Sequence, residues 1–308
     1  MRVVSYNLPA GINAALKSAF GDFTPRRQKL GPATADAEAE IAVITITSGA
    51  SAAALSKMPR LRAIVTASAG TDHIDSAECS RRGIAVRNCP SYSSNAVAEL
   101  AIALAFAGLR DMGRMLGFGK ALAYPPTCFH HIGSELSGKK CSVLGTGAIG
   151  TLIAKKLLAL GCAVSAFSRS ESPELVSMGV RYLPLDEALR GADIVFIALP
   201  STPQTRHILD ERALSHLRDG AGLVNIARGE LVDSAALLKR IGRLSFVATD
   251  VVEGEAALWV GRPMKVRAVE ELVGKGNFHL VPHIGASTSE AQARLAAETV
   301  AAVRSFAD

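Results

Sequence analysis

A glycine-rich turn between an apolar strand and an apolar helix constrains the fold most strongly. The strand predicted at residues 141–144 is followed at once by Gly145-Thr-Gly147-Ala-Ile-Gly150 and then by the helical run TLIAKKLLAL. Gly145 permits a tight turn, Gly147 lets the backbone approach a pyrophosphate, and Gly150 allows close packing of the helix on the strand. The helix N-terminus adds free N–H groups and a positive dipole end. The motif therefore predicts a dinucleotide site, formed by Gly145, Gly147, Ala148, Ile149 and Gly150.

The residues after the second strand of this unit indicate which dinucleotide is bound. In NAD-binding folds a carboxylate roughly 20 residues beyond the glycines holds the ribose 2′-OH. Here the strand CAVSAF ends in Ser168, Arg169 and Ser170, which offer two hydroxyls and a guanidinium. Charge-assisted bonds to a 2′-phosphate favour NADP as cofactor, with NAD as the second candidate. The alternative is that Arg169 is a solvated turn residue and that Glu171 or Glu174 meets the ribose.

Short apolar strands alternate with helical patterns along almost the whole chain, which is typical of parallel sheets covered by helices. A long helix is predicted over residues 94–116, with Asn95 as a candidate cap. Residues 123–138 contain several Pro and Gly breaks and predict an irregular connection. Strands are predicted near residues 2–6, 41–46, 62–66, 84–87, 141–144, 162–167, 193–199, 222–226, 245–249 and 278–282.

The length and the order of these elements favour two domains. A single hydrophobic core stops growing at roughly 250 to 300 residues, and this chain has 308. After the last strand, residues 288–306 are apolar at helical spacing. This helix is expected to return and pack on the first domain, which would make that domain discontinuous.

Composition excludes several classes of protein. Hydrophobic residues make up 49% and charged residues 20%, as in an ordinary globular protein. The longest apolar stretch, 97–109, is shorter than the roughly 20 residues that cross a bilayer, and the N-terminus lacks a secretory signal pattern. The formal charge of +6 comes without a dense Lys/Arg run, so no nucleic-acid partner is expected. A cytoplasmic location and five reduced, mostly buried cysteines are predicted: Cys79, Cys89, Cys128, Cys141 and Cys162.

Three later segments carry a resemblance to a known family. They are LVNIARGELVD around Arg228, VATDVVEGE with Asp250 and Glu255, and LVPHIGASTSEAQ around His283. Together with SAGTDHID, VAELAIAL and ALPSTPQT, these segments resemble the D-isomer-specific 2-hydroxyacid dehydrogenases, which include phosphoglycerate, glyoxylate and hydroxypyruvate dehydrogenases or reductases. The resemblance spans roughly residues 69–292. It implies reduction of a small 2-keto acid to the D-2-hydroxy acid by hydride transfer, and the residues after the second strand favour NADPH as the hydride source.

The residue types fit that chemistry. A guanidinium can hold the carboxylate of a 2-keto acid and polarise the adjacent carbonyl, which suits Arg228. The alkoxide formed by hydride transfer needs a proton, and a histidine such as His283 can donate it near neutral pH. By analogy with the family, Glu255 is the carboxylate that orients this imidazole, and Asp250 is a supporting group. The simpler interpretations are an interface ion pair for Arg228 and a loop histidine bonded to backbone for His283.

The resemblance also assigns further residues. In the substrate domain it implies that backbone N–H groups of Ser68, Ala69 and Gly70 bind the substrate carboxylate, unless this loop is an ordinary strand-to-helix turn. In the cofactor domain it implies nucleotide contacts from Asn95, Leu199, Pro200, Thr205, Ala227, Asp250 and His283, with Asn95, Pro200 and Ala227 at the nicotinamide end.

The expected fold class is α/β with two domains. The resemblance implies a doubly wound parallel-sheet Rossmann cofactor domain, residues 91–285, plus a smaller flavodoxin-like α/β substrate domain, residues 1–90 plus 286–308. It further implies hinge closure around the substrate and a homodimer built largely on the cofactor domain, since the helix AVAELAIALAFAGL is apolar on most faces.

Two alternative functions remain open at this point. The segment HIGASTSEAQ is similar to the NAD-linked phosphoglycerate dehydrogenases, and some relatives of this fold are non-catalytic nucleotide-sensing corepressors.

The family usually has a proline after its catalytic glutamate, whereas Ala256 follows Glu255 here. Residues 256–276 depart most from the family pattern, so two roles are open for Trp259: lining the substrate pocket or packing.

Overall fold

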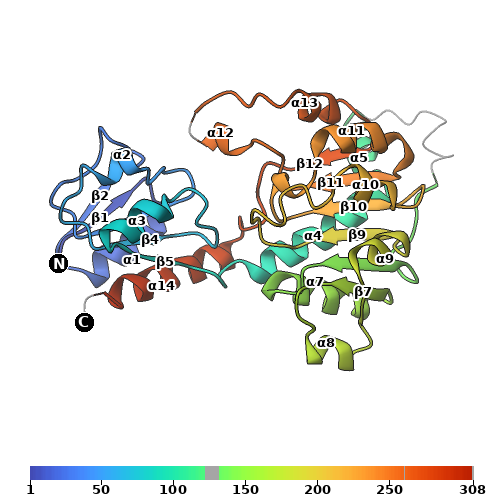
Figure 1. The fold of residues 1–308 in the computed structure, drawn as a ribbon, viewed down its shortest axis with the longest axis horizontal. Helices are drawn as coiled ribbons and strands as arrows, with labels where there is room; N and C mark the ends of the chain where they lie inside the picture. Colours follow the sequence, from blue (N-terminus) through green and yellow to red (C-terminus); the bar gives the residue numbers. More distant parts are fainter. Residues whose placement is uncertain (122–131, 260, 307–308) are drawn as a thin grey trace. The chain divides into compact units, whose positions relative to one another are not determined.

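The computed structural model describes residues 1–121, 132–259 and 261–306 (Figure 1). The chain divides into two compact units, the first with residues 1–93, 256–263 and 286–308 and the second with residues 94–255 and 264–285. Most of the segment 123–138 that is predicted to be irregular, including Cys128, lies outside the described residues. The other four cysteines are free and buried, as predicted.

The first unit contains a five-stranded parallel sheet in the order β2-β1-β3-β4-β5. This is the strand order of flavodoxin-like folds. Strand β2 is not among the predicted strands, because its sequence FTPR is polar, contains Pro25 and is only partly buried at the sheet edge. The strands are β1 (Val3–Tyr6), β2 (Phe23–Arg26), β3 (Ile41–Ile44), β4 (Ala63–Thr66) and β5 (Ala85–Asn88).

Helices cover this sheet. Apolar residues of alternate sheet positions, among them Val4, Ala42 and Ile64, form one buried cluster with the helices α2 (Ala52–Leu55) and α3 (Ser76–Arg82). The helix α1 (Ala10–Ala19) packs on the C-terminal helix α14 (Ser289–Arg304), which also contacts β4 and β5. The predicted 288–306 helix thus packs on elements of the first unit, and the Thr288 side chain caps it by accepting from the Ala291 N–H.

The second unit contains a seven-stranded parallel sheet in the order β12-β11-β10-β9-β6-β7-β8. The chain begins the sheet in its middle, builds one side, and then returns to build the other from β9 onward. This is the doubly wound arrangement, which opens a ligand crevice at the carboxyl ends of β6 and β9. The strands are β6 (Lys140–Leu144), β7 (Ala163–Phe167), β8 (Arg181–Tyr182), β9 (Ile194–Ile197), β10 (Gly222–Asn225), β11 (Phe246–Thr249) and β12 (Phe278–Leu280).

Alternation along these strands divides the core of the second unit between the two faces of the sheet. Val143 and Phe196 point to one face, and Leu144 and Ile197 to the other. The first face is covered by α4 (Ser94–Leu109), α7 (Ala148–Ala159) and α8 (Pro173–Ser177). The second face is covered by α9 (Leu185–Arg190), α10 (Glu211–Ser215), α11 (Ser234–Arg240) and α13 (Arg267–Val273). The predicted α/β class with two parallel sheets is therefore confirmed.

The prediction of one continuous helix over residues 94–116 is wrong. The chain leaves α4 at Leu109 and starts α5 (Met112–Lys120) after a break at Asp111, whose φ is +48°. Asp tolerates this left-handed conformation, and Gly108 and Gly113 on either side lower the helix propensity. Asn95 is also not a cap, because α4 already includes Ser94.

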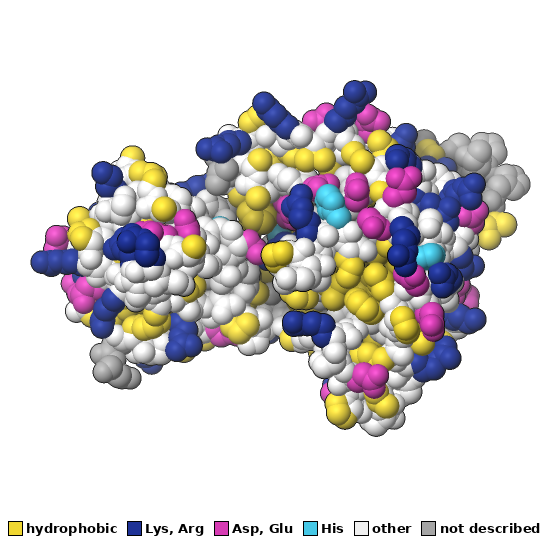
Figure 2. Space-filling model, viewed as in Figure 1, with side chains coloured by type: hydrophobic (Ala, Val, Ile, Leu, Met, Phe, Trp, Pro, Cys, Tyr) yellow, Lys and Arg dark blue, Asp and Glu magenta, His cyan; other side chains and the backbone are white. Residues whose placement is uncertain are grey.

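Surface charge and helix length bear on two predictions, that the chain has no nucleic-acid partner and that it does not cross a membrane. Lys and Arg side chains are interspersed with Asp and Glu on the face shown in Figure 2. Within the described part of the chain, no helix combines the length and apolar character needed to span a membrane.

Candidate functional site

The carboxyl ends of the second unit's parallel strands bring the predicted site segments to one edge of the sheet (Figure 1). The glycine loop, residues 145–150, follows β6, and residues 168–170 follow β7. Leu199 follows β9, Arg228 follows β10, Asp250 follows β11 and His283 follows β12. Because the carboxyl ends of parallel strands all lie at the same side of the sheet, segments as far apart in sequence as Gly145 and His283 become neighbours there by topology.

His283 and Glu255 form a direct pair. The imidazole Nδ1 lies 2.9 Å from Glu255 Oε1, with side-chain exposures of 26% for the histidine and 10% for the glutamate. The second carboxylate oxygen of Glu255 accepts from the Val252 N–H at 3.3 Å. The carboxylate is therefore fixed, and its bond to Nδ1 orients the ring so that Nε2 is the nitrogen that can exchange a proton with a substrate.

Asp250 holds the loop that carries His283. Its two carboxylate oxygens accept from the Ile284 N–H at 2.7 Å and from the Gly285 N–H at 2.9 Å. The His283 N–H also donates to the Asp250 carbonyl, and His283 itself has a φ of +52°. Burial raises the pKa of the Asp250 carboxyl, while these backbone hydrogen bonds oppose the rise. Its side-chain oxygens thus bond the protein's own backbone, a role that the sequence does not reveal.

The absence of a side chain at Gly285 allows Asp250 to approach the backbone of this loop. A methyl group at Gly285 would lie 2.9 Å from Asp250 Oδ2, closer than real Cβ contacts come. Gly229 plays a similar part beside Arg228, since a methyl group there would lie 2.0 Å from the Val252 carbonyl carbon. The loop with Arg228 is therefore pressed against the loop that leads to Glu255.

Arg228 is positioned by Asn225, the last residue of β10. The Asn225 side chain accepts from the Ala227 N–H at 3.0 Å and donates to the Arg228 carbonyl at 2.9 Å. The Arg228 guanidinium donates through Nη1 to the Ala227 carbonyl at 2.8 Å and is half-buried. Asn225 is itself buried and was not among the predicted site residues, because nothing in the sequence distinguishes it from other strand-end residues.

The glycine loop has the geometry that a dinucleotide needs. Gly145 has a φ of +95°, and a methyl group on it would lie 2.8 Å from the Ala198 carbonyl oxygen at the end of β9. A methyl group on Gly150 would lie 1.8 Å from the Gly145 carbonyl oxygen. A methyl group on Gly147 would meet no atom within 4 Å, and no side chain caps α7, so the first-turn N–H groups of this helix have no capping side chain as acceptor. The loop fits a pyrophosphate at this helix end.

The segment after β7 is also suited to an anionic group. Arg169 is exposed, and within the described residues no carboxylate pairs with it. Glu174, one of the two acids considered for the ribose, instead forms an ion pair with Lys155 at 2.6 Å. Glu171 is exposed in the same segment.

Two other predicted nucleotide contacts have local partners. The Thr205 hydroxyl donates to the Pro200 carbonyl at 2.7 Å and so shapes the loop after β9. The Asn95 side chain donates to Glu99 at 2.8 Å, one turn further along α4.

Trp259 lies in α12 (Ala256–Trp259) of the first unit, where its carbonyl accepts from Lys29.

In the first unit, the loop Ser68-Ala69-Gly70 follows β4 with its carbonyls tied back. The Ser68 carbonyl accepts from the Cys89 N–H, the Ala69 carbonyl from the Asn88 side chain, and the Gly70 carbonyl from the Ser68 hydroxyl. In the described residues, no acceptor bonds the N–H groups of Ala69 and Gly70. Such a loop offers donors to an anion.

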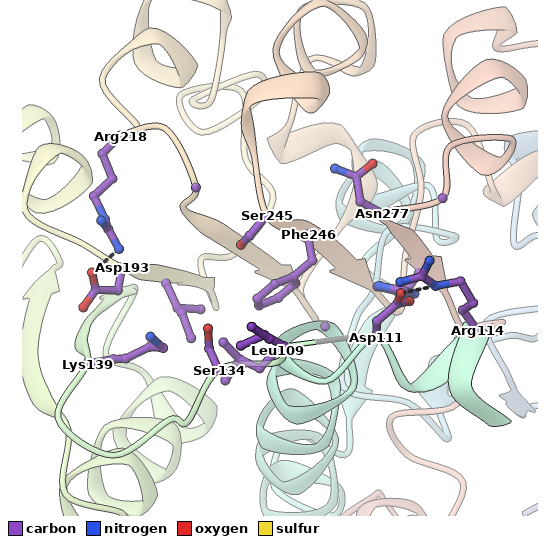
Figure 3. A pocket seen from close by; sticks show the side chains of 16 residues that line it. Leu109, Asp111, Arg114, Ser134, Lys139, Asp193, Arg218, Ser245, Phe246 and Asn277 are labelled. Carbon is purple, nitrogen blue, oxygen red and sulfur yellow. Dashed lines mark hydrogen bonds and ion pairs between the residues drawn. The ribbon is translucent and has the colours of Figure 1, made fainter. Parts of the chain in front are cut away.

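A cavity of about 430 Å³ lies elsewhere in the second unit (Figure 3). Its lining includes Ile194, Ser245 and Phe246, which stand at the amino ends of β9 and β11, together with the ion pair of Asp193 and Arg218. The cavity therefore lies at the amino ends of the strands, whereas the glycine loop and His283 lie at the carboxyl ends. It is not the candidate active site.

Comparisons with known proteins agree with this geometry. Residues 102–285 match the family model of the D-isomer specific 2-hydroxyacid dehydrogenase NAD binding domain. The chain is 34% identical to glyoxylate/hydroxypyruvate reductase A of Arabidopsis thaliana over 81% of its own length and 76% of that protein. It is 33% identical to D-3-phosphoglycerate dehydrogenase of Mycobacterium bovis over 91% of its length, but over only 51% of that protein. The structure of Aquifex aeolicus D-lactate dehydrogenase, complexed with NAD and lactic acid, superimposes with a TM-score of 0.89 at 30% identity, covering 99% of this chain and 95% of the other.

Proposed function

Because the chain belongs to the D-isomer-specific 2-hydroxyacid dehydrogenases, which are NAD(P)-dependent oxidoreductases, we propose that it uses NADPH to reduce a small 2-keto acid to the D-2-hydroxy acid. The substrate would be of glyoxylate or hydroxypyruvate size. The observation that carries the proposal is the pair of His283 Nδ1 and Glu255 Oε1 at 2.9 Å, on the sheet edge that also holds the glycine loop. In this proposal the first unit is the substrate domain and the second is the cofactor domain.

Three side chains of the second unit share the chemistry. When bound, a reduced nicotinamide would supply the hydride for the keto carbon. Arg228 polarises the keto carbonyl of the substrate, and the π electron pair of that carbonyl moves onto its oxygen. His283 donates the Nε2 proton to that oxygen, and Glu255 holds the imidazole in orientation and stabilises the ring while it is charged. In the direction of oxidation His283 takes the proton back.

The carboxylate of the substrate is assigned to the loop Ser68-Ala69-Gly70. The N–H groups of Ala69 and Gly70 support this assignment because they lack acceptors among the described residues, while the loop's carbonyls are engaged. Two N–H donors aimed at one carboxylate give charge-assisted hydrogen bonds without adding a side chain to the substrate space.

The preference for NADPH is assigned to Arg169, with Ser168 and Ser170 as further donors. Arg169→Asp should raise the KM for NADPH by about tenfold or more, because a carboxylate repels the 2′-phosphate, and should leave the KM for NADH nearly unchanged. Lys275→Asp, an equal charge reversal at another exposed site of the second unit, is the matched control. A wild-type enzyme that prefers NADH would contradict the assignment.

A substrate panel tests the reaction itself. Purified protein is assayed with NADPH and with NADH against glyoxylate, hydroxypyruvate and a bulkier 2-keto acid, and the hydroxy acid formed is analysed on a chiral column. We expect steady NADPH consumption and a D product. NAD-linked oxidation of 3-phosphoglycerate without keto-acid reduction would favour the phosphoglycerate branch, and no turnover with any substrate would favour a nucleotide-sensing binding protein.

We also propose a homodimer formed through the second unit. Helices α4 and α5 leave large apolar side chains at the surface, with Phe106 41%, Met112 39% and Leu116 56% exposed. A second copy of the chain covering these residues would remove that apolar area from water.

A further inference from the structure

Tyr182 links two loops of the proposed cofactor site. Its hydroxyl donates to Thr146 Oγ1 at 3.0 Å and accepts from the Ser172 N–H at 2.9 Å. Thr146 lies between the first two glycines of the glycine loop, and Ser172 ends the segment after β7. One hydroxyl thus connects the proposed pyrophosphate cradle to the proposed 2′-phosphate segment.

The segment between the two anchors is short. At its start, the Phe167 carbonyl at the end of β7 accepts from the Gly145 N–H at 2.7 Å. At its end, Ser172 caps α8 by accepting from the Leu175 N–H and is bonded to Tyr182. Only residues 168–171 lie between, and they include all three proposed 2′-phosphate donors. Fixing both ends reduces the conformational freedom that these donors lose when they bind an anion.

We propose that Tyr182 is a positioning residue for recognition of the ribose 2′-phosphate, acting by holding the segment 168–172 against the glycine loop. The inference rests on the proposed preference for NADP. The hydroxyl does not contact the phosphate; it sets where Ser168, Arg169 and Ser170 stand. Its contribution is therefore specific to the phosphorylated ribose, although one of its partners, Thr146, belongs to the loop used by either cofactor.

The test uses Tyr182→Phe, which keeps the ring and removes only the hydroxyl. Calorimetry measures the Kd of the full-length protein for adenosine 2′,5′-bisphosphate and for 5′-AMP, which differ only in the 2′-phosphate. We expect the bisphosphate to bind about tenfold more weakly to the variant, a change of about 1.4 kcal/mol, while 5′-AMP changes by less than about threefold. The ratio of KM for NADPH to KM for NADH should rise in parallel.

Two further variants separate positioning from a general loss of structure. Thr146→Val cuts the same link from the glycine loop and should also lower the preference for the bisphosphate. Tyr6→Phe is the matched control: the Tyr6 hydroxyl likewise accepts a backbone N–H, from Asp36 at 2.9 Å, but in the first unit. Its melting temperature should fall without any change in the ratio of the two Kd values.

The outcomes distinguish this inference from the function on which it rests. If the wild type binds the bisphosphate and 5′-AMP equally, the proposed NADP preference fails, and the inference fails with it. If the wild type prefers the bisphosphate but Tyr182→Phe and Thr146→Val keep the same ratio, the role of Tyr182 is refuted while the NADP preference stands. An equal weakening of both ligands would also refute it, because that result describes general support of the site.

Discussion

The residue His283 is held through its ring and through its backbone by two different carboxylates. Glu255 bonds the ring at Nδ1, and Asp250 binds the N–H groups of the next two residues. The ring contact sets the imidazole's tautomer and direction, while the backbone contacts maintain a left-handed conformation that non-glycine residues rarely adopt. Orientation of the proposed acid is thus built into the protein before any substrate binds.

The sequence could propose Arg228, Glu255 and His283 as site residues because their chemistry and their motifs point to the same reaction. It could not predict what Asp250 bonds, since that depends on backbone N–H groups turned by the conformation of His283. Nor could it predict Tyr182, whose approach to Thr146 requires β8 to pair with β7. A two-residue strand leaves no periodic pattern.

The burial of Asp250 predicts a pH dependence of stability. Its pKa is raised above the ordinary value of 3.8, so the folded protein binds this proton more tightly than the unfolded chain does. Its contribution to the free energy of unfolding is therefore greatest at low pH and declines as the pH rises from 3.8 through the raised pKa. Asp250→Asn does not titrate at this position. In denaturant titrations, the wild-type value minus the variant value should fall across that window and then level off.

A wild-type advantage that grows with pH over the same window would contradict the raised pKa. The comparison should be made at constant ionic strength, so that screening of surface charges does not change along with pH.

At the scale of elements, the site depends on strand order and on glycines at points of close approach. The alternating pattern predicts most strands and the glycine-loop helix, because buried parallel strands are apolar runs with turn residues between them. The strands β2 and β8 and the break between α4 and α5 were missed. These features arise from a polar edge sequence, a strand of two residues and a left-handed Asp111, which hydrophobic patterning does not detect.

The glycines at 147 and 150 should respond differently to the same substitution. Gly150→Ala places a methyl group 1.8 Å from the Gly145 carbonyl oxygen, so the free energy of unfolding should fall by about 1–3 kcal/mol or more. Gly147→Ala meets no protein atom within 4 Å and should leave stability nearly unchanged, but it should weaken NADPH binding by about tenfold or more because the methyl group occupies the proposed pyrophosphate space.

Thermal melts and NADPH titrations of the two variants measure these effects. Normal NADPH affinity in Gly147→Ala would place the pyrophosphate elsewhere, and full stability in Gly150→Ala would contradict the close packing of the helix on the loop.

At the scale of the whole molecule, two of the points in the sequence where the chain changes unit follow the proposed acid and its partner closely. The chain leaves the second unit directly after Glu255, and it leaves again after Gly285, two residues beyond His283. The sequence predicts a discontinuous first unit because an apolar helix follows the last strand of the second unit. The short excursion at residues 256–263 could not, since that stretch departs from the family pattern and has no strong periodicity.

The proposed dimer gives a prediction at this scale. Phe106→Asp puts a charge into the apolar surface of α4, so light scattering should show a shift from twice the mass of one chain towards a single chain. Leu160→Asp is the control, because Leu160 is 39% exposed at the end of α7 and outside that surface. A wild-type protein that is monomeric at all concentrations would remove the dimer from the account.

The central claim is that the imidazole of His283 supplies the proton in reduction of a 2-keto acid. The direct measurement is the turnover of His283→Asn, since Asn accepts the left-handed backbone at φ +52°. His207→Asn is the matched control, because His207 has a φ of +50° and bonds Glu253 at 2.8 Å in a similar pair. We predict that His283→Asn lowers kcat by about 10²–10⁴-fold with an unchanged Kd for NADPH, while His207→Asn keeps most of its activity. Wild-type turnover in His283→Asn would contradict the claim.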